Sequence, residues 1–94
     1  MPEVFFRIRW PDKTVDRCYS PSTVVEDYFA VGATYPVAEF VEMSRQALTA
    51  ASDRVRKIYR YGCSQAAAQL ADIERIAARF TAQGATVTVE GFER

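Results

Sequence analysis

The clearest structural signal in the sequence is the segment 36–61, PVAEFVEMSRQALTAASDRVRKIYRY. Its acidic residues come early and its basic residues late, which suits the dipole of an α-helix. Pro36 fits a first helical turn, and Gly62 is the predicted stop. At 1.5 Å per residue the predicted helix is about 39 Å long. Its apolar face follows from spacings of three and four at Val37, Phe40, Val41, Ser44, Ala47, Leu48, Ala51, Val55 and Ile58.

A further helix is predicted directly after this segment. Ser64 is a good N-cap residue, and Gln83-Gly84 marks the expected end. The small alanine side chains permit close approach to the preceding helix, so the two are expected to form an α-helical hairpin. The apolar face of this helix consists of Ala67, Leu70, Ile73, Ala77 and Phe80.

The flanking segments predict strands and one short helix. Residues 4–19 are rich in strand formers and contain turn residues at 11–13, so they predict a β-hairpin. Ser22 is the expected cap of a short helix over Thr23–Ala30, and residues 33–35 are predicted to be a linker. Residues 85–90 alternate small apolar and polar side chains, as a final strand does. The order β-β-α-α-α-β predicts one α+β domain over residues 1–94, with a three-stranded sheet covered on one face by two helices.

The composition excludes several classes of function. The 94 residues carry 12 basic and 12 acidic side chains, so a sequence-independent grip on nucleic acid is not expected. The absence of histidine removes the commonest general base and metal ligand. No apolar run reaches the length of a membrane span and no cofactor motif occurs, and a signal peptide is not expected. We therefore expect a cytoplasmic protein without a cofactor, whose two cysteines are reduced.

Cys63 is the candidate for thiol chemistry. It lies just before the expected start of a helix at Ser64, where the helix dipole favours a thiolate. Arg54, Ser64 and Cys18 are the candidate helpers, and Cys18 could form a redox pair with Cys63 if the two met. The alternative reading makes Cys63 a small apolar filler in a turn between helices.

Two charged clusters have simpler structural explanations. Basic residues at 54, 56, 57 and 60, interleaved with tyrosines, suggest an anion or nucleic-acid site, but cations near the end of a helix also complement its dipole. Acidic residues at 26, 27, 39 and 42 suggest acid–base or cation chemistry, yet early helical turns attract carboxylates for electrostatic reasons alone. Neither cluster predicts a site.

An aromatic-rich set near the short helix is the candidate interface. It consists of Tyr28, Phe29, Val31 and Tyr35. If these side chains were exposed together, they would form an apolar patch of the kind that binds partners. If they were buried, they would be core.

Several short segments resemble one family of proteins. Residues 8–12 (IRWPD), 18–22 (CYSPS), 53–55 (DRV) and 63–64 (CS), in this order and spacing, resemble short bacterial nitrogen starvation response proteins. These are found in gene clusters with a nitrilase, a radical-SAM protein and an acetyltransferase-like protein. Lys13 and Arg60 stand where the family pattern has glycine. The resemblance carries over no activity or catalytic residue. It implies a setting in nitrogen scavenging, from nitriles or cyanide-like compounds.

The sequence therefore favours a non-enzymatic accessory protein of nitrogen-starvation metabolism that binds a protein partner or forms a homo-oligomer. A small thiol-dependent enzyme or small-molecule-binding protein centred on Cys63 is the alternative. A nucleic-acid-binding regulator is a third hypothesis, which predicts salt-dependent retention on DNA.

Overall fold

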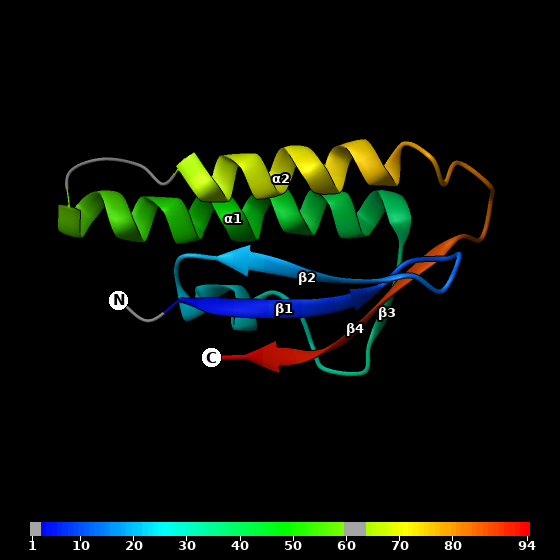
Figure 1. Cartoon of the computed structure of the whole chain (residues 1–94), viewed down its shortest axis with the longest axis horizontal. Coiled ribbons are helices and arrows are strands. Elements are labelled where there is room, and N and C mark those ends of the chain that lie inside the picture. Colours follow the sequence, from blue (N-terminus) through cyan, green and yellow to red (C-terminus); the bar gives the residue numbers. More distant parts are fainter. Residues whose placement is uncertain (1–2, 60–63) are drawn as a thin grey trace.

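The structure is a computed structural model that describes residues 3–59 and 64–94. A layer of two helices lies on a twisted antiparallel sheet (Figure 1). Along the chain the elements are β1 (Val4–Arg9), β2 (Val15–Ser20), the 3-10 helix η1 (Thr23–Asp27), β3 (Thr34–Pro36), α1 (Val37–Tyr59), α2 (Ser64–Ala77) and β4 (Thr86–Glu93).

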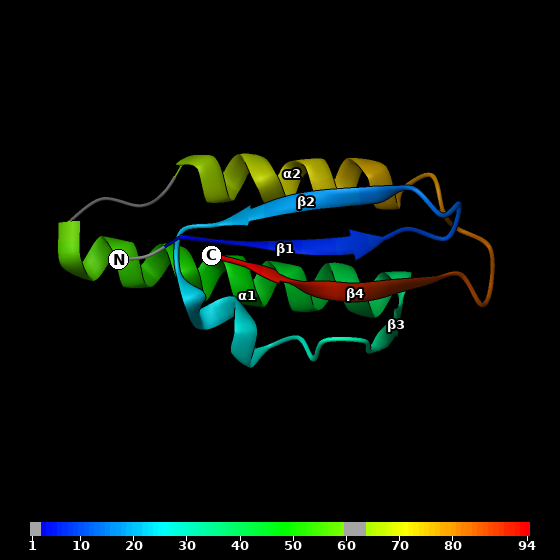
Figure 2. The same cartoon turned by 60° about the horizontal axis from the view of Figure 1, so that its bottom comes forward.

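The sheet has the strand order β2-β1-β4-β3, and every neighbouring pair is antiparallel. The C-terminal strand β4 thus lies in the middle of the sheet, beside β1. Both helices lie behind the same face of the sheet, so within residues 3–59 and 64–94 no helix lies over its other face (Figure 2). The α+β class and the placement of two helices on one face are as predicted.

The prediction of a three-stranded sheet was wrong, because residues 34–36 form a fourth strand. The sequence predicts a linker and the first turn of a helix for these residues. They pair with residues 86–88 of β4 at the sheet edge, where Pro36 is tolerated because its missing N–H faces no neighbour. A strand of three residues is too short to show a period of two, and a proline within it argues against a strand.

The core lies between the sheet and the helices. Along β1, Val4, Phe6 and Ile8 are fully buried and alternate with partly or fully exposed neighbours, as a strand with one covered face requires. Trp10 continues this series and is 2% exposed. Its ring stacks on Phe80 and meets Phe40 of α1 edge-on, with centroids 5.7 and 5.8 Å away. These contacts fix the helix layer on the sheet.

The turn between β1 and β2 has a left-handed residue. The amide of Trp10 donates to the carbonyl of Thr14 (2.8 Å), and that of Lys13 donates to the carbonyl of Trp10 (2.9 Å). Lys13 has a φ of 75°, a conformation that glycine adopts without steric cost. Hydrogen bonds from the side chain and amide of Thr14 lower the pKa of the exposed Asp12 carboxyl.

The helical elements differ from the prediction at their ends. The short helix is a 3-10 helix that ends at Asp27, and Ser22 caps it as predicted, accepting from the amide of Val24. α2 ends at Ala77, so Phe80 packs on the core from the connecting loop. β4 runs on to Glu93, beyond the predicted end at residue 90. The predicted stop at Gly62 lies outside the described residues.

Candidate functional site

The face of the sheet away from the helices carries a connected set of polar and aromatic side chains. Alternation along each strand sends these side chains to the uncovered side, while their neighbours enter the core. We name this surface the open sheet face. It consists of Phe5, Arg7, Arg9, Val15, Arg17, Tyr19, Thr34, Thr88, Glu90 and Glu93.

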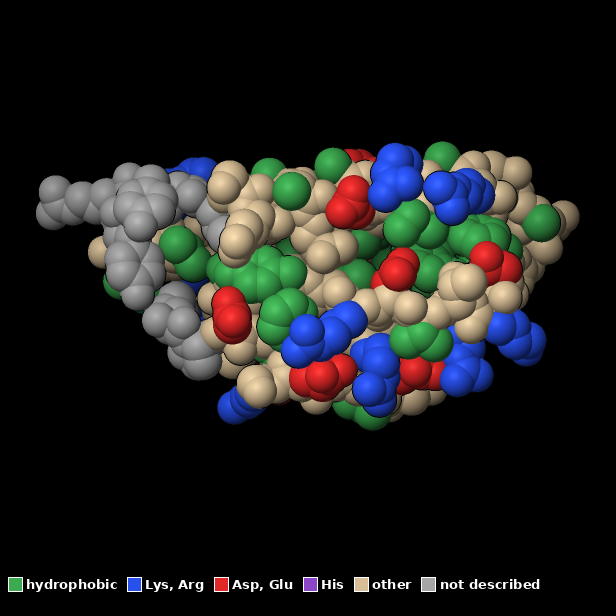
Figure 3. Space-filling model, in the orientation of Figure 1, with side chains coloured by type: hydrophobic (Ala, Val, Ile, Leu, Met, Phe, Trp, Pro, Cys, Tyr) green, Lys and Arg blue, Asp and Glu red, His purple; other side chains and the backbone are tan. Residues whose placement is uncertain are grey.

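Ion pairs cross the open sheet face from β1 and β2 to β4. Arg9 Nη2 lies 2.6 Å from Glu90 Oε2, and Arg7 reaches both Glu90 (3.5 Å) and Glu93 (3.4 Å). Arg17 Nε lies 3.2 Å from Glu93 Oε1. Because β1 lies between β2 and β4, the arginines form one stripe and the glutamates another beside it. Figure 3 shows basic and acidic side chains interleaved along this side of the molecule.

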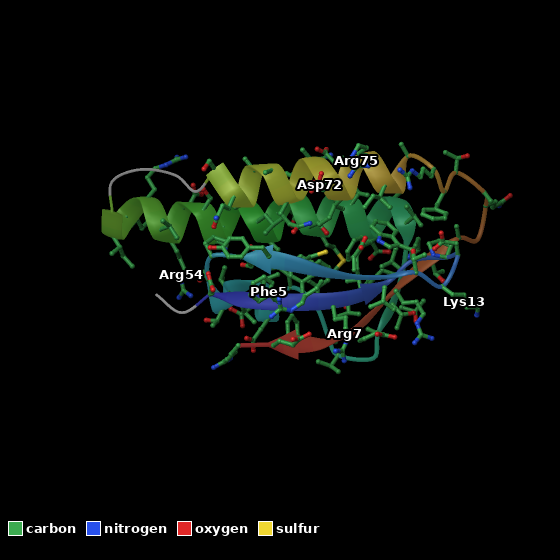
Figure 4. All side chains as sticks on the ribbon, viewed as in Figure 1. Phe5, Arg7, Lys13, Arg54, Asp72 and Arg75 are labelled. Carbon is green, nitrogen blue, oxygen red and sulfur yellow. The ribbon has the colours of Figure 1, made fainter. Side chains whose placement is uncertain are left out.

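Aromatic side chains extend the charged stripes at one end. Phe5, which projects from β1 together with Arg7 (Figure 4), meets the Tyr19 ring edge-on with centroids 5.7 Å apart. The guanidinium carbon of Arg17 lies 3.8 Å from the centroid of the Phe5 ring, a cation–π contact. Val15, on β2, leaves 45% of its surface exposed. The open sheet face therefore combines rigid aromatic area with both signs of charge.

The ion pairs on this face are exposed mainly on their arginine side, because the side chain of Glu90 is only 21% exposed. The side chains of Arg7, Arg9 and Arg17 expose 48%, 50% and 56% of their surface. Exposed pairs of this kind stabilise a fold by about 0–1 kcal/mol each, because solvent screens them. Each guanidinium has five N–H donors, so one that contacts a glutamate can still bind a second acceptor. The arrangement is suited to recognising a surface that carries charges of both signs.

The thiol hypothesis concerned Cys63, which lies outside the described residues and stays a prediction. Cys18, its suggested partner, is 2% exposed and packs in the core from β2. Burial raises the pKa of the Cys18 thiol well above its ordinary value, and the charges of Asp16 and Asp72 add to the effect. A buried thiol with a raised pKa is a poor nucleophile. Cys18 therefore has the properties of a core residue.

The other two helper candidates lie on the helices. Ser64 is the first residue of α2 and is exposed. Arg54 projects from α1 (Figure 4), and its Nη1 lies 3.5 Å from the oxygen of Ser22, which caps η1. Arg54 thus connects α1 with the start of η1.

The two charged clusters are dispersed over helix surfaces. Within the basic cluster, Arg56 pairs with Asp53 (3.6 Å) and Arg60 lies outside the described residues. Among the acidic residues, Glu26 accepts two hydrogen bonds from Arg94, and Glu42 pairs with Arg45. Across residues 3–59 and 64–94 no group of three or more histidine, cysteine or acidic residues could hold a metal ion.

The candidate aromatic patch is divided between core and surface. Phe29 is 3% exposed and stacks on Phe6 with centroids 5.6 Å apart. Tyr35 is half-buried, packs against Phe29, and its hydroxyl accepts from the amide of Ala30. Tyr28 also packs against the core, whereas Val31 is 63% exposed. The predicted interface is untested, but Phe29 itself is a core side chain.

The helix layer is hollowed at one end. A groove of about 580 Å³ lies between the start of α1, the end of α2 and the loop before β4. Small and apolar side chains line it, among them Ala38, Val41, Ala77 and Phe80, with Arg45 at its edge. A smaller hollow of about 200 Å³ lies between the two helices. Neither contains a cluster of groups suited to acid–base or nucleophilic chemistry among the side chains that line it.

The fold and the open sheet face define a small two-layer α+β protein whose sheet has one uncovered side. This chain belongs to the nitrogen starvation-induced protein NitG family, whose model matches residues 5–92. A search of curated proteins and a search of solved structures gave no match. The family match agrees with the resemblance carried by residues 8–12 and 18–22. No helix in the described ranges is long and apolar enough to cross a membrane.

Sequence reasoning missed the open sheet face as a site. The alternation of apolar and charged residues from Phe6 to Trp10 did predict that one side of this strand is exposed to solvent. It did not predict that Glu90 and Glu93 would lie beside those arginines, because the pairing of β1 with β4 joins opposite ends of the chain. Arg7 and Arg9, two residues apart, can be recognised in the sequence as one face of a strand, whereas Glu90 and Glu93 are three residues apart and share a face only through the register shift opposite Arg7 and Ile8.

Proposed function

We propose that this chain is an accessory protein of the nitrogen-starvation response that acts by binding another protein chain through the open sheet face. The setting in nitrogen scavenging that the resemblance implies is part of this proposal. The observation that carries it is the open sheet face itself: an uncovered side of the sheet on which aromatic, arginine and glutamate side chains are held together. Aromatic and arginine side chains are enriched at the centres of protein interfaces.

The mixture of charges favours a protein over a polyanion as the partner. Glu90 and Glu93 lie within 3.5 Å of the arginines, so a phosphate backbone on this face would meet carboxylates as well as guanidinium groups. The chain also has no net charge to attract nucleic acid from a distance. A protein surface with both signs of charge meets no such conflict.

The test is an affinity capture from nitrogen-starved and nitrogen-replete cells of the source organism, with two matched variants. Val15 lies on the open sheet face and Val31 belongs to the sequence-predicted patch, and both are exposed valines. Wild-type protein is expected to capture a stoichiometric partner from starved cells. Val15→Glu is expected to lose it, and Val31→Glu to retain it.

Three outcomes would contradict parts of this proposal. Capture of no protein by the wild type, in either lysate, would contradict the accessory function. If Val31→Glu lost the captured partner and Val15→Glu retained it, the interface would be the patch around Tyr28 and Tyr35 and not the open sheet face. Cys63→Ala is expected to capture the same partner, and a loss there would favour the thiol-centred alternative.

A further inference from the structure

The two charged stripes of the open sheet face are arranged so that the face complements itself. The arginine stripe (Arg7, Arg9 and Arg17) lies on β1 and β2, and the glutamate stripe (Glu90 and Glu93) lies on β4. The boundary between the stripes runs along the strands, between β1 and β4.

A two-fold axis parallel to the strands, above the boundary, brings a second copy face to face with the first. Rotation about this axis exchanges the two sides of the sheet. The β1 part of the arginine stripe, Arg7 and Arg9, therefore lies over the glutamate stripe on β4 of the other copy, and the reverse holds at the same time, while β2 with Arg17 lies over β3. Such an isologous contact, in which the same patch is used by both subunits, is the commonest arrangement in soluble oligomers.

We propose that the occupant of the open sheet face is a second copy of this chain, which forms a homodimer with Arg7 and Arg9 of each copy over Glu90 and Glu93 of its partner. This inference rests on the proposed function, because it names the protein chain that the face binds. The half-exposed guanidinium groups keep donors for the second copy while they contact their own glutamates.

The size of the face sets the strength of the expected contact. β1 has six residues and is therefore about 20 Å long, and four strands at about 4.8 Å spacing are roughly 15–20 Å wide. Each copy thus contributes on the order of 300–400 Å² in projection, which is less than the ~800 Å² per partner of a standard interface. The dimer is expected to be weak, to depend on concentration, and to dissociate as salt screens the charges.

Self-complementarity gives a test that no other partner would pass. In Glu90→Arg/Glu93→Arg both stripes are basic, and in Arg7→Glu/Arg9→Glu the face is mostly acidic. Each variant alone is expected to be monomeric at a concentration where the wild type is dimeric, because like charges face each other. A 1:1 mixture of the two is expected to associate, because each basic stripe then meets an acidic one.

The experiment is light scattering after size-exclusion chromatography, with folding of each variant checked by circular dichroism. Glu42→Arg/Glu74→Arg is the matched control: these glutamates contact Arg45 on the helix layer, and the variant has the same change of net charge. It is expected to dimerise like the wild type. If either altered-charge variant fails to fold, the single variants Glu90→Arg and Arg9→Glu replace the pair.

The outcomes separate this inference from the proposed function. A wild type that is monomeric at all concentrations, or a folded mixture that does not associate, would overturn the homodimer. A monomeric protein whose capture of a different protein is abolished by Val15→Glu would retain the proposed function and reject the second copy as occupant. Dimerisation of both altered-charge variants alone would also overturn the inference, because like stripes would then be in contact.

Discussion

The indole Nε1 of Trp10 donates a hydrogen bond to Asp16 Oδ2 across a distance of 2.7 Å. Trp10 is the single tryptophan of the chain and is 2% exposed, so this bond satisfies a buried donor in the core. Asp16 belongs to β2, and Trp10 follows β1. The bond therefore fastens the turn end of the hairpin to the aromatic contacts that hold the helix layer.

Removal of the acceptor is expected to destabilise the protein. Asp16→Ala leaves the indole N–H buried without a partner, which costs about 1–3 kcal/mol of the free energy of unfolding. Asp16→Asn keeps an acceptor oxygen and is expected to cost less. Urea unfolding followed by Trp10 fluorescence measures both variants. Equal stability of wild type and Asp16→Ala would show that the hydrogen bond contributes nothing.

A glycine at position 13 is expected to stabilise the hairpin. Lys13 adopts a φ of 75°, which is strained for a residue with a Cβ atom. Lys13→Gly is therefore predicted to raise the free energy of unfolding by about 0.5–1 kcal/mol. Lys13→Ala is the control, because it shortens the side chain but keeps the Cβ atom. A gain in thermal stability for alanine as large as that for glycine would contradict this explanation.

Two buried serines are predicted to respond in opposite directions when replaced by alanine. Ser44 Oγ is the buried side-chain oxygen that has no hydrogen-bond partner within the described part of the chain. Ser44→Ala removes the cost of burying that hydroxyl and is expected to stabilise the protein by about 1 kcal/mol. Ser22 caps η1, so Ser22→Ala is expected to destabilise by about 0.5–2 kcal/mol. Loss of stability in Ser44→Ala would indicate that its hydroxyl has a partner.

The buried thiol of Cys18 predicts a loss of stability at alkaline pH. Burial raises its pKa in the folded protein, whereas a thiol in the unfolded chain has a pKa of about 8.5. Above that pH the folded state keeps a proton that the unfolded state has lost. The stabilisation that the buried, protonated Cys18 thiol contributes to the free energy of unfolding is therefore fully present below about pH 8.5. Above that pH it decreases by about 1.4 kcal/mol per pH unit, until the pKa of the thiol in the folded protein is reached.

A comparison with Cys18→Ala isolates this effect from the titration of lysines and tyrosines. The stability difference between wild type and variant is expected to narrow by about 1–2 kcal/mol between about pH 7.5 and about pH 10, in reducing buffer. Urea unfolding at the two pH values measures it. A difference that stays constant over this range would mean that the Cys18 thiol has an ordinary pKa in the fold.

The sequence predicted those elements whose signals are local. The alternation in β1, the Ser22 cap and the amphipathic pattern of α1 are each carried by residues that are close together in the sequence, so period and capping chemistry predicted them. Ile58 is an exception on the predicted apolar face of α1, because it is 54% exposed. β3 was missed because a strand of three residues containing Pro36 has no readable period. The burial of Phe29 depends on contacts with Phe6 and Phe40, which are distant in sequence. The aromatic composition alone does not decide whether the side chains of the predicted patch are buried in the core or exposed at the surface.

The candidate site depends more than the fold does on pairing between strands that are far apart in the sequence. The open sheet face exists because β4 inserts between β1 and β3, which brings Glu90 and Glu93 to arginines more than 70 residues away. A register shift between Arg7 and Ile8 also sets which β4 side chains reach that face. Neither the strand order nor the irregularity has a local sequence signal.

Sedimentation velocity of the wild-type protein over a concentration series, at low and high salt, tests the homodimer on the open sheet face most directly. Concentrations from about 10 µM to about 1 mM cover the range of a weak interface. At low salt the average mass is predicted to rise with concentration from the chain mass of 10.6 kDa towards twice that value, and high salt is predicted to reverse the rise. A mass that stays at 10.6 kDa throughout the series would contradict the homodimer.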